Sequence, residues 1–142
     1  MKVKPRQADH GAWLVLQGSW TKGGRPREVP IRTAAQRDVL ERAKALARTG
    51  ALIPPTRRYH QQQRVYEYET RRVGLAKMHG LRHAYAQERY QELTGWAAPA
   101  AGGPRNAQLT PAQRERDLEA RLVISAELGH GREGITTAYL GR

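Results

Sequence analysis

Glycine and proline residues mark where the helices and strands of this chain are expected to be interrupted. The breaks fall at Gly50, at Pro54-Pro55, in the Gly-, Pro- and Ala-rich stretch 95–110, and at Gly129. Glycine adopts turn conformations at low cost, and proline lacks the N–H that a helix interior requires. The 142 residues have the length of one domain with one modest core. We therefore predict a single domain over residues 1–142 with a mostly helical α+β fold.

The N-terminal part predicts a β-hairpin over residues 12–31. Residues 12–17 (AWLVLQ) and 27–31 (REVPI) have strand composition, and the intervening segment contains Gly23 and Gly24. Paired glycines supply the backbone angles of a tight reversal. This places Lys22 at or near the hairpin tip.

Residues 33–142 are predicted to be mainly helical. Thr33 and Gln36 fit a capping box at the start of a helix that Gly50 ends. Further helices are expected over 57–76 and 79–93, and from Thr110-Pro111 to Gly129. The expected apolar positions of the first helix are Ala35, Val39, Ala43, Leu46 and Ala47, those of the second are Val65 and Tyr68, and those of the last are Leu118, Leu122, Ile124, Ser125 and Leu128.

The charge of the chain favours a polyanionic partner. Lys and Arg number 25 against 13 Asp and Glu, which gives a net charge of +12. Nucleic acid is the first partner class that such a charge suggests, and an anionic membrane surface is the second. The absence of cysteine excludes disulfides and thiolate zinc sites, and no apolar run is long enough to cross a bilayer. The default expectation is a cytoplasmic protein without a membrane segment.

Three separated motifs are candidates for chemistry, and the first contains His79, Arg82 and His83. Their spacing of i, i+3 and i+4 places all three on one side of a helix. An exposed basic face or a metal-binding histidine pair would have the same spacing. The metal interpretation is weak, because no cysteine and no HExxH arrangement is present, and we predict no metal site.

The second motif is Leu128-Gly129-His130, followed nine positions later by Tyr139, and the third is the hairpin turn with Lys22. A terminal tyrosine usually packs against a core, and a turn lysine is usually solvated. The order of a phosphate-binding GxxxxGK[ST] loop is absent around Lys22.

Taken together and in order, these motifs resemble the tyrosine recombinases of the phage-integrase family. That family has a hairpin lysine, then H-x-x-R, then L-G-H, and then T-T-x-x-Y or a close variant ending in the nucleophile. This chain has Lys22, His79-Gly-Leu-Arg82, Leu128-Gly-His130 and Thr136-Thr-Ala-Tyr139. The long connection between residues 96 and 110 resembles a subgroup from integrating mobile elements.

The resemblance implies site-specific cleavage and rejoining of double-stranded DNA without a cofactor or metal. Tyr139 would attack the phosphate, Arg82 and His130 would donate to its oxygens, His79 would handle the phenol proton, and Lys22 would protonate the leaving oxygen. An arginine fork matches two phosphate oxygens, as this chemistry requires. The residues expected to contact DNA are Arg25, Arg57, Arg58 and His83.

The chain also departs from the family pattern. The first catalytic arginine of the family has no counterpart in this chain. Arg6 is the only arginine in residues 1–11, and the residues around it do not match the family motif, which makes enzymatic activity uncertain. We expect an N-terminally incomplete C-terminal part of the catalytic domain, lacking the N-terminal DNA-binding domain, with possible homo-oligomers on DNA. The alternative is a truncated, inactive DNA-binding remnant. A basic structural or RNA-binding protein is a third hypothesis, disfavoured by the lack of phenylalanine and of a tyrosine platform on a strand.

Overall fold

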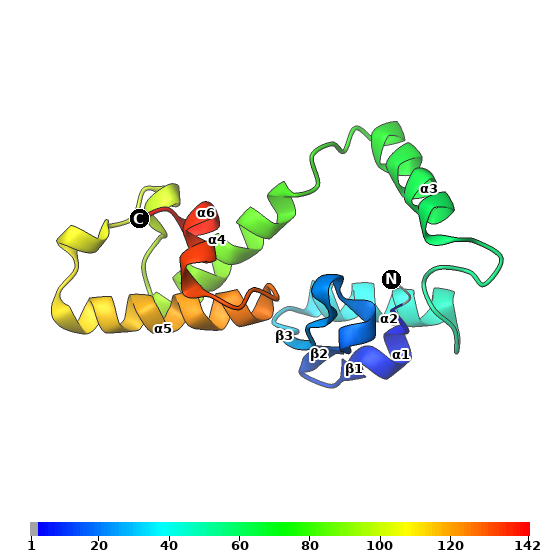
Figure 1. Cartoon of the computed structure of the whole chain (residues 1–142), viewed down its shortest axis with the longest axis horizontal. Helices are drawn as coiled ribbons and strands as arrows, with labels where there is room; N and C mark the ends of the chain where they lie inside the picture. Colours follow the sequence, from blue (N-terminus) through cyan, green and yellow to red (C-terminus); the bar gives the residue numbers. More distant parts are fainter. Residues whose placement is uncertain (1–2) are drawn as a thin grey trace. The chain divides into compact units, whose positions relative to one another are not determined.

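The computed structural model describes residues 3–142, with the side chain of Lys22 left out, and its trace is shown in Figure 1. Internal contacts divide the chain into two units, Met1–Ala76 and Lys77–Arg142, which are described separately below. Helices dominate, and a small antiparallel sheet lies near the N-terminus. The predicted mostly helical α+β class is confirmed, while the single domain over 1–142 stays a prediction.

The first unit contains a three-stranded antiparallel sheet in the order β1-β2-β3. Its strands are β1 (Asp9–His10), β2 (Trp13–Leu16) and β3 (Arg27–Pro30), with Leu14 paired to Val29 and Asp9 to Leu14. The predicted hairpin is therefore confirmed. Strand β1 and the preceding α1 (Pro5–Ala8) were not predicted, because elements of two and four residues show no periodicity.

The hairpin connection contains two single turns, η1 (Gly18–Trp20) and η2 (Lys22–Gly24). Gly23 and Gly24 both have positive φ, at 81° and 69°, which is the left-handed geometry that glycine tolerates. The hydroxyl of Thr21 donates to the carbonyl oxygen of Arg25 at 2.6 Å, and Trp20 is buried. The connection is thus an ordered turn, with Lys22 within it as predicted.

Helix α2 (Ala34–Ala47) begins with the predicted capping box, and its end is marked by Arg48. The hydroxyl of Thr33 accepts from the Gln36 N–H at 3.1 Å, and the Gln36 side chain accepts from the Thr33 N–H at 3.3 Å. The expected apolar face is partly wrong, because Val39 and Leu46 are 59% and 80% exposed.

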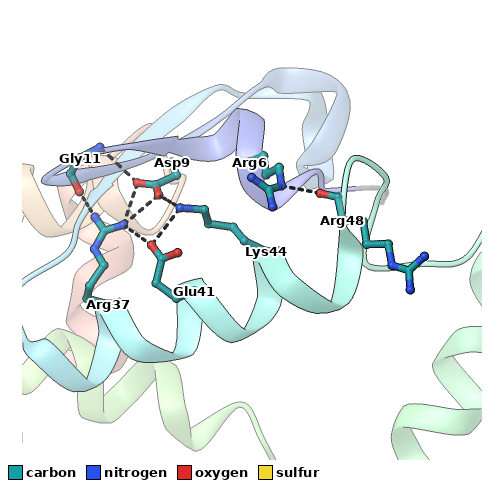
Figure 2. A network of polar contacts seen from close by, with 7 residues as sticks. All are labelled: Arg6, Asp9, Gly11, Arg37, Glu41, Lys44 and Arg48. Carbon is teal, nitrogen blue, oxygen red and sulfur yellow. Dashed lines mark hydrogen bonds and ion pairs between the residues drawn. The ribbon is translucent and has the colours of Figure 1, made fainter.

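A polar network connects α2 to the sheet (Figure 2). The carboxylate of Asp9 accepts from Arg37 at 2.8 and 2.9 Å and from the Lys44 ammonium at 2.8 Å. Hydrogen bonds from these cations lower the pKa of Asp9 to about 2, with Lys44 the largest cause. On the same side, Arg6 donates to the backbone oxygen of Arg48 at 2.8 Å. Ion pairs therefore join α2 to β1.

Helix α3 (Tyr59–Arg72) is the last element of the first unit and has no buried residue. Of its two expected apolar positions, Val65 is partly covered, whereas Tyr68 is 64% exposed. The helix was predicted over 57–76, and the structure shortens it at both ends. It therefore presents most of its surface, including Arg64, Arg71 and Arg72, to solvent.

The second unit packs helix α4 (Gly80–Thr94) against α5 (Pro111–Glu127) and the short α6 (Thr137–Leu140). The turn η5 (Glu133–Thr136) precedes α6, and the connection between α4 and α5 contains η3 (Pro99–Ala101) and η4 (Asn106–Gln108). One cluster forms its core: Ala86, Tyr90, Ala98, Ala120, Ile124, Leu128, Tyr139 and Leu140.

The buried face of α5 differs in part from the expected one. Ile124, Ser125 and Leu128 are buried as predicted, but Leu118 and Leu122 are 49% and 51% exposed. Buried Ala120 and the nearly buried Arg121 replace them on the packed side. A small residue and a paired arginine carry too little hydropathy to be recognised as a core face from sequence.

Candidate functional site

The start of α4 brings three of the predicted residues to one place. His79 precedes the first turn, and Arg82 and His83 follow at i+3 and i+4 on the same face. The rings of His79 and His83 lie edge to face with centroids 5.7 Å apart. The spacing in the sequence therefore predicted their proximity correctly.

Arg82 reaches from α4 to the end of α5. Its Nη2 donates to the backbone oxygen of Leu128 at 2.8 Å and lies 3.2 Å from Nε2 of His130. Its Nε is buried and has no hydrogen-bond partner among the described residues. A guanidinium has five N–H donors, so the contacts to Leu128 and His130 do not use the full donor capacity of Arg82.

The Leu128-Gly129-His130 turn is held by its own backbone. Gly129 has φ of 77°, and the N–H of His130 donates to the carbonyl oxygen of Ser125 at 2.8 Å. The Ser125 hydroxyl donates to the backbone oxygen of Arg132 at 2.9 Å. Glycine permits the left-handed turn that ends α5. This geometry directs the His130 ring toward α4 and α6.

Tyr139 lies on α6 and is buried, with 6% of its surface exposed. Its hydroxyl is 3.2 Å from Nε2 of His130. Its ring centroid lies 4.9 Å from that of His83 and 6.2 Å from that of His79. The guanidinium carbon of Arg82 lies 5.9 Å from the same ring centroid. One phenol is thus surrounded by three imidazoles and one guanidinium.

A buried ion pair that the sequence analysis did not single out supports this site. Glu127 directly precedes Leu128, and its carboxylate accepts from Arg89 at 3.0 to 3.2 Å and from the Tyr85 hydroxyl at 2.7 Å. Burial lowers the pKa of Arg89, but the hydrogen bonds and charge of Glu127 outweigh burial and raise it above its ordinary value. The one available signal was an acidic residue within the apolar end of a helix.

The other predicted residues belong to the first unit. Lys22 lies in η2, and its side chain is outside the described part of the structure. Arg25 is exposed just after that turn. Arg57 donates to the Gln62 side chain at 3.1 Å, and Arg58 is the exposed residue preceding α3. These positions present cations to solvent on the hairpin connection and at the start of α3.

The second unit brings one phenol, one guanidinium and three imidazoles together. A phenol can attack an electrophile, an arginine can bind oxyanions, and an imidazole can donate, accept or transfer a proton. Among the described helices, none is both long and apolar enough to span a membrane.

A comparison with models of known protein families identifies the family of this chain. A family model described as "Integrase" matches residues 6–88, more than half of the chain, and the chain belongs to this integrase family. The match includes the sheet, α2, α3 and the residues His79, Arg82 and His83. Comparisons with curated proteins and with solved structures gave no match.

Proposed function

We propose that this chain cleaves and rejoins DNA strands in site-specific recombination through a covalent bond between Tyr139 and a 3′ phosphate. Family membership suggests DNA integration or recombination. The observation that carries the specific chemistry is the placement of Tyr139 3.2 Å from His130, which itself lies 3.2 Å from Arg82. A nucleophile beside two phosphate donors suits a phosphodiester transesterification.

The proposed step forms one bond and breaks one. The Tyr139 oxygen attacks phosphorus and loses its proton to His79, while Arg82 and His130 donate to the non-bridging oxygens. The bond from phosphorus to the 5′ oxygen breaks, and Lys22 supplies a proton to that oxygen. The phosphotyrosine conserves the bond energy, and attack by a 5′ hydroxyl reverses the step. The roles of His79 and Lys22 rest on the resemblance to tyrosine recombinases.

Binding to DNA is proposed to involve cations from both units. Arg25, Arg57 and Arg58 are exposed, and His83 lies beside the Tyr139 ring. Arginine and lysine contacts to phosphates release counterions, so affinity should fall steeply as salt increases. We also propose that several copies assemble on DNA, and that the chain acts in the integration of a mobile element.

An adduct assay tests the chemistry. Purified protein is incubated with nicked duplexes of mixed sequence. After cleavage, the short fragment that carries the released 5′ hydroxyl diffuses away, and the phosphotyrosine is trapped because it has no 5′ hydroxyl to rejoin. We expect an SDS-resistant protein–DNA species, which mass spectrometry of peptides assigns to Tyr139. Tyr139→Phe should abolish it, whereas Tyr66→Phe, at a half-exposed tyrosine of α3, should not. An adduct that persists in Tyr139→Phe would refute the assignment.

A second candidate is DNA binding without chemistry, which the exposed basic surface of α3 favours. Arg64, Arg71 and Arg72 are all exposed on this helix, and Arg57 and Arg58 immediately precede it. Both candidates predict salt-sensitive binding to duplex DNA, so salt dependence does not distinguish them. Salt-sensitive binding with no adduct from any nicked duplex would support the binding function.

A further inference from the structure

The chain leaves α6 through a close contact with the connection between α4 and α5. Leu140 is fully buried, and Gly141 follows with φ of 74° and ψ of −175°. A Cβ added at Gly141 would lie 3.0 Å from the backbone nitrogen of Ala100 and 3.4 Å from Cβ of Pro99. The backbone after Tyr139 therefore lies close to η3, and a side chain at Gly141 would require its neighbours in η3 to shift.

The segment that provides this contact, residues 95–103, is itself fixed at its start. The Thr94 hydroxyl accepts from the Trp96 N–H at 3.3 Å and lies 3.0 Å from the Trp96 backbone oxygen. The indole N–H of Trp96 donates to the Tyr90 hydroxyl at 3.2 Å, and Tyr90 is fully buried. Ala98 is 1% exposed and belongs to the same core cluster as Tyr139. The 95–103 segment is thus part of the core of the second unit rather than a free loop.

Backbone contacts also fix the C-terminal end of the 95–103 segment. The N–H of Gly103 donates to the carbonyl oxygen of Ala98 at 2.9 Å. A Cβ at Gly103 would lie 1.7 Å from the carbonyl oxygen of Ala97, so only glycine allows this closure. The turn therefore holds Pro99 and Ala100 at a fixed position opposite Gly141.

Helix α6 needs such support, because a helix of four residues has too few hydrogen bonds to be stable alone. On the α4 side, the Gln87 amide donates to the backbone oxygen of Tyr139 at 3.1 Å. After α6, Gly141 lies close to Ala100, and α6 itself contacts η3. The position of the Tyr139 phenol is consequently set by contacts outside α6.

We propose that the 95–103 segment is a positioning element that holds Tyr139 in the site of its own chain, with Gly141, Pro99 and Ala100 as the positioning residues. The proposal rests on the proposed function for its catalytic consequence. The structural part of the proposal does not depend on catalytic activity. It states that releasing the contact at Gly141 should expose Tyr139 without unfolding the second unit.

Nitration by tetranitromethane measures that exposure without any need for activity. In the unchanged protein, Tyr139 and Tyr90 should react slowly relative to the exposed Tyr59, Tyr66 and Tyr68, which serve as internal standards. Gly141→Ala forces a side chain into a backbone region that is essentially restricted to glycine and against Ala100. We expect the nitration rate of Tyr139 to rise by about tenfold, while Tyr90 stays protected.

Two further variants sharpen the test. Gly74→Ala introduces a side chain at a similar φ of 76° into open space in the first unit, and should leave Tyr139 protected. Pro99→Gly removes the ring opposite Gly141 without altering α6, and should raise the nitration of Tyr139 by a smaller factor. Unchanged protection of Tyr139 in Gly141→Ala, or loss of Tyr90 protection together with Tyr139, would overturn the proposal.

The adduct assay then separates this inference from the proposed function. At saturating DNA, Gly141→Ala should form the adduct about tenfold more slowly with an unchanged dissociation constant for DNA, because only the placement of the nucleophile is altered. Absence of an adduct in the unchanged protein would defeat the proposed function, while the nitration result would still decide the structural role. Adduct formation at the same rate in Gly141→Ala and the unchanged protein would overturn the positioning role.

Discussion

The hydroxyl of Tyr139 and Nε2 of His130 lie 3.2 Å apart, and the same ring nitrogen is 3.2 Å from Nη2 of Arg82. A guanidinium only donates, so an Nε2 without a proton can accept from Arg82 or from the Tyr139 hydroxyl, whereas an Nε2 that carries a proton can donate to the Tyr139 oxygen but cannot pair with Arg82. The protonation of this one ring atom therefore decides whether Arg82 can hydrogen-bond to it. The environment of the phenol is coupled to Arg82 through His130.

Replacing Arg82 with lysine should impair adduct formation, although it preserves the charge. Lysine lacks the planar fork that binds two phosphate oxygens, and one lost donor commonly costs about 10²–10³ in rate. The backbone oxygen of Leu128 also loses its donor, which we expect to cost about 1 kcal/mol of unfolding free energy. Single-turnover adduct formation and urea unfolding measure the two effects. Arg116→Lys, at an exposed arginine of α5, is the control. Equal rates of adduct formation in the Arg82→Lys and Arg116→Lys variants would contradict the proposed role of Arg82.

Removing the charge of Glu127 should destabilise the second unit. The side chains of Arg89 and Glu127 are 16% and 6% exposed, so Glu127→Gln leaves a largely buried guanidinium without its main counter-charge. We expect a loss of about 3 kcal/mol of unfolding free energy, measured by urea denaturation. Adduct formation should slow as well, because Glu127 precedes the Leu128-Gly129-His130 turn.

The control for this prediction is Glu92→Gln, which removes the other carboxylate bonded to Arg89. That carboxylate is 46% exposed, so its loss should cost less than about 1 kcal/mol. Similar losses of unfolding free energy in Glu127→Gln and Glu92→Gln would show that the stability contributed by the Arg89–Glu127 pair does not depend on its burial.

Much of the local structure was predictable because it depends on neighbours in sequence. The capping box at Thr33, the hairpin turn with paired glycines, and the common face of His79, Arg82 and His83 all follow from spacings of a few residues. Such patterns are governed by backbone geometry that any fold shares. The proximity of His130 and Tyr139 across nine positions was suggested only by the family resemblance.

Contacts between distant segments were not predictable from the same patterns. Val39 and Leu46 formed a convincing apolar stripe, yet α2 is held to β1 by Asp9, Arg37 and Lys44. Periodicity identifies which residues share a face, but it does not identify what covers that face. Likewise, the Gly-, Pro- and Ala-rich stretch 95–110 was recognised only as a break between helices, and nothing in its composition indicated the contact with Gly141.

Acid should weaken the attachment of α2 to the sheet through Asp9. Its pKa of about 2 is below the ordinary value of 3.8, so the ion pairs contribute fully above pH 4 and are lost as the pH falls toward 2. Asp9→Asn should remove this pH dependence and cost roughly 1 kcal/mol at neutral pH, because Arg37 and Lys44 are partly solvated. Hydrogen exchange of the α2 amides measures the effect, and Asp38→Asn, at an exposed carboxylate of α2, is the control.

Alkali should weaken the second unit through Tyr90. Burial, together with the hydrogen bond to Asp117 at 2.5 Å, raises the pKa of this phenol to about 12. The folded unit favours the neutral phenol, so its contribution is complete below pH 10 and is lost as the pH rises from 10 through 12. Ultraviolet absorbance should therefore show a phenol that ionises near pH 12 in the unchanged protein, and Tyr90→Phe should lack it.

At neutral pH, Tyr90→Phe should cost about 1–2 kcal/mol of unfolding free energy, because Asp117 and the Trp96 indole both lose a partner. Tyr59→Phe, at an exposed phenol of α3, should leave both the stability and the high-pH titration unchanged. Since Trp96 begins the 95–103 segment that contacts Gly141, the Tyr90 variant should also increase the nitration of Tyr139. A Tyr90→Phe protein with unaltered stability and unaltered protection of Tyr139 would mean that the 95–103 segment is held by its backbone turn alone.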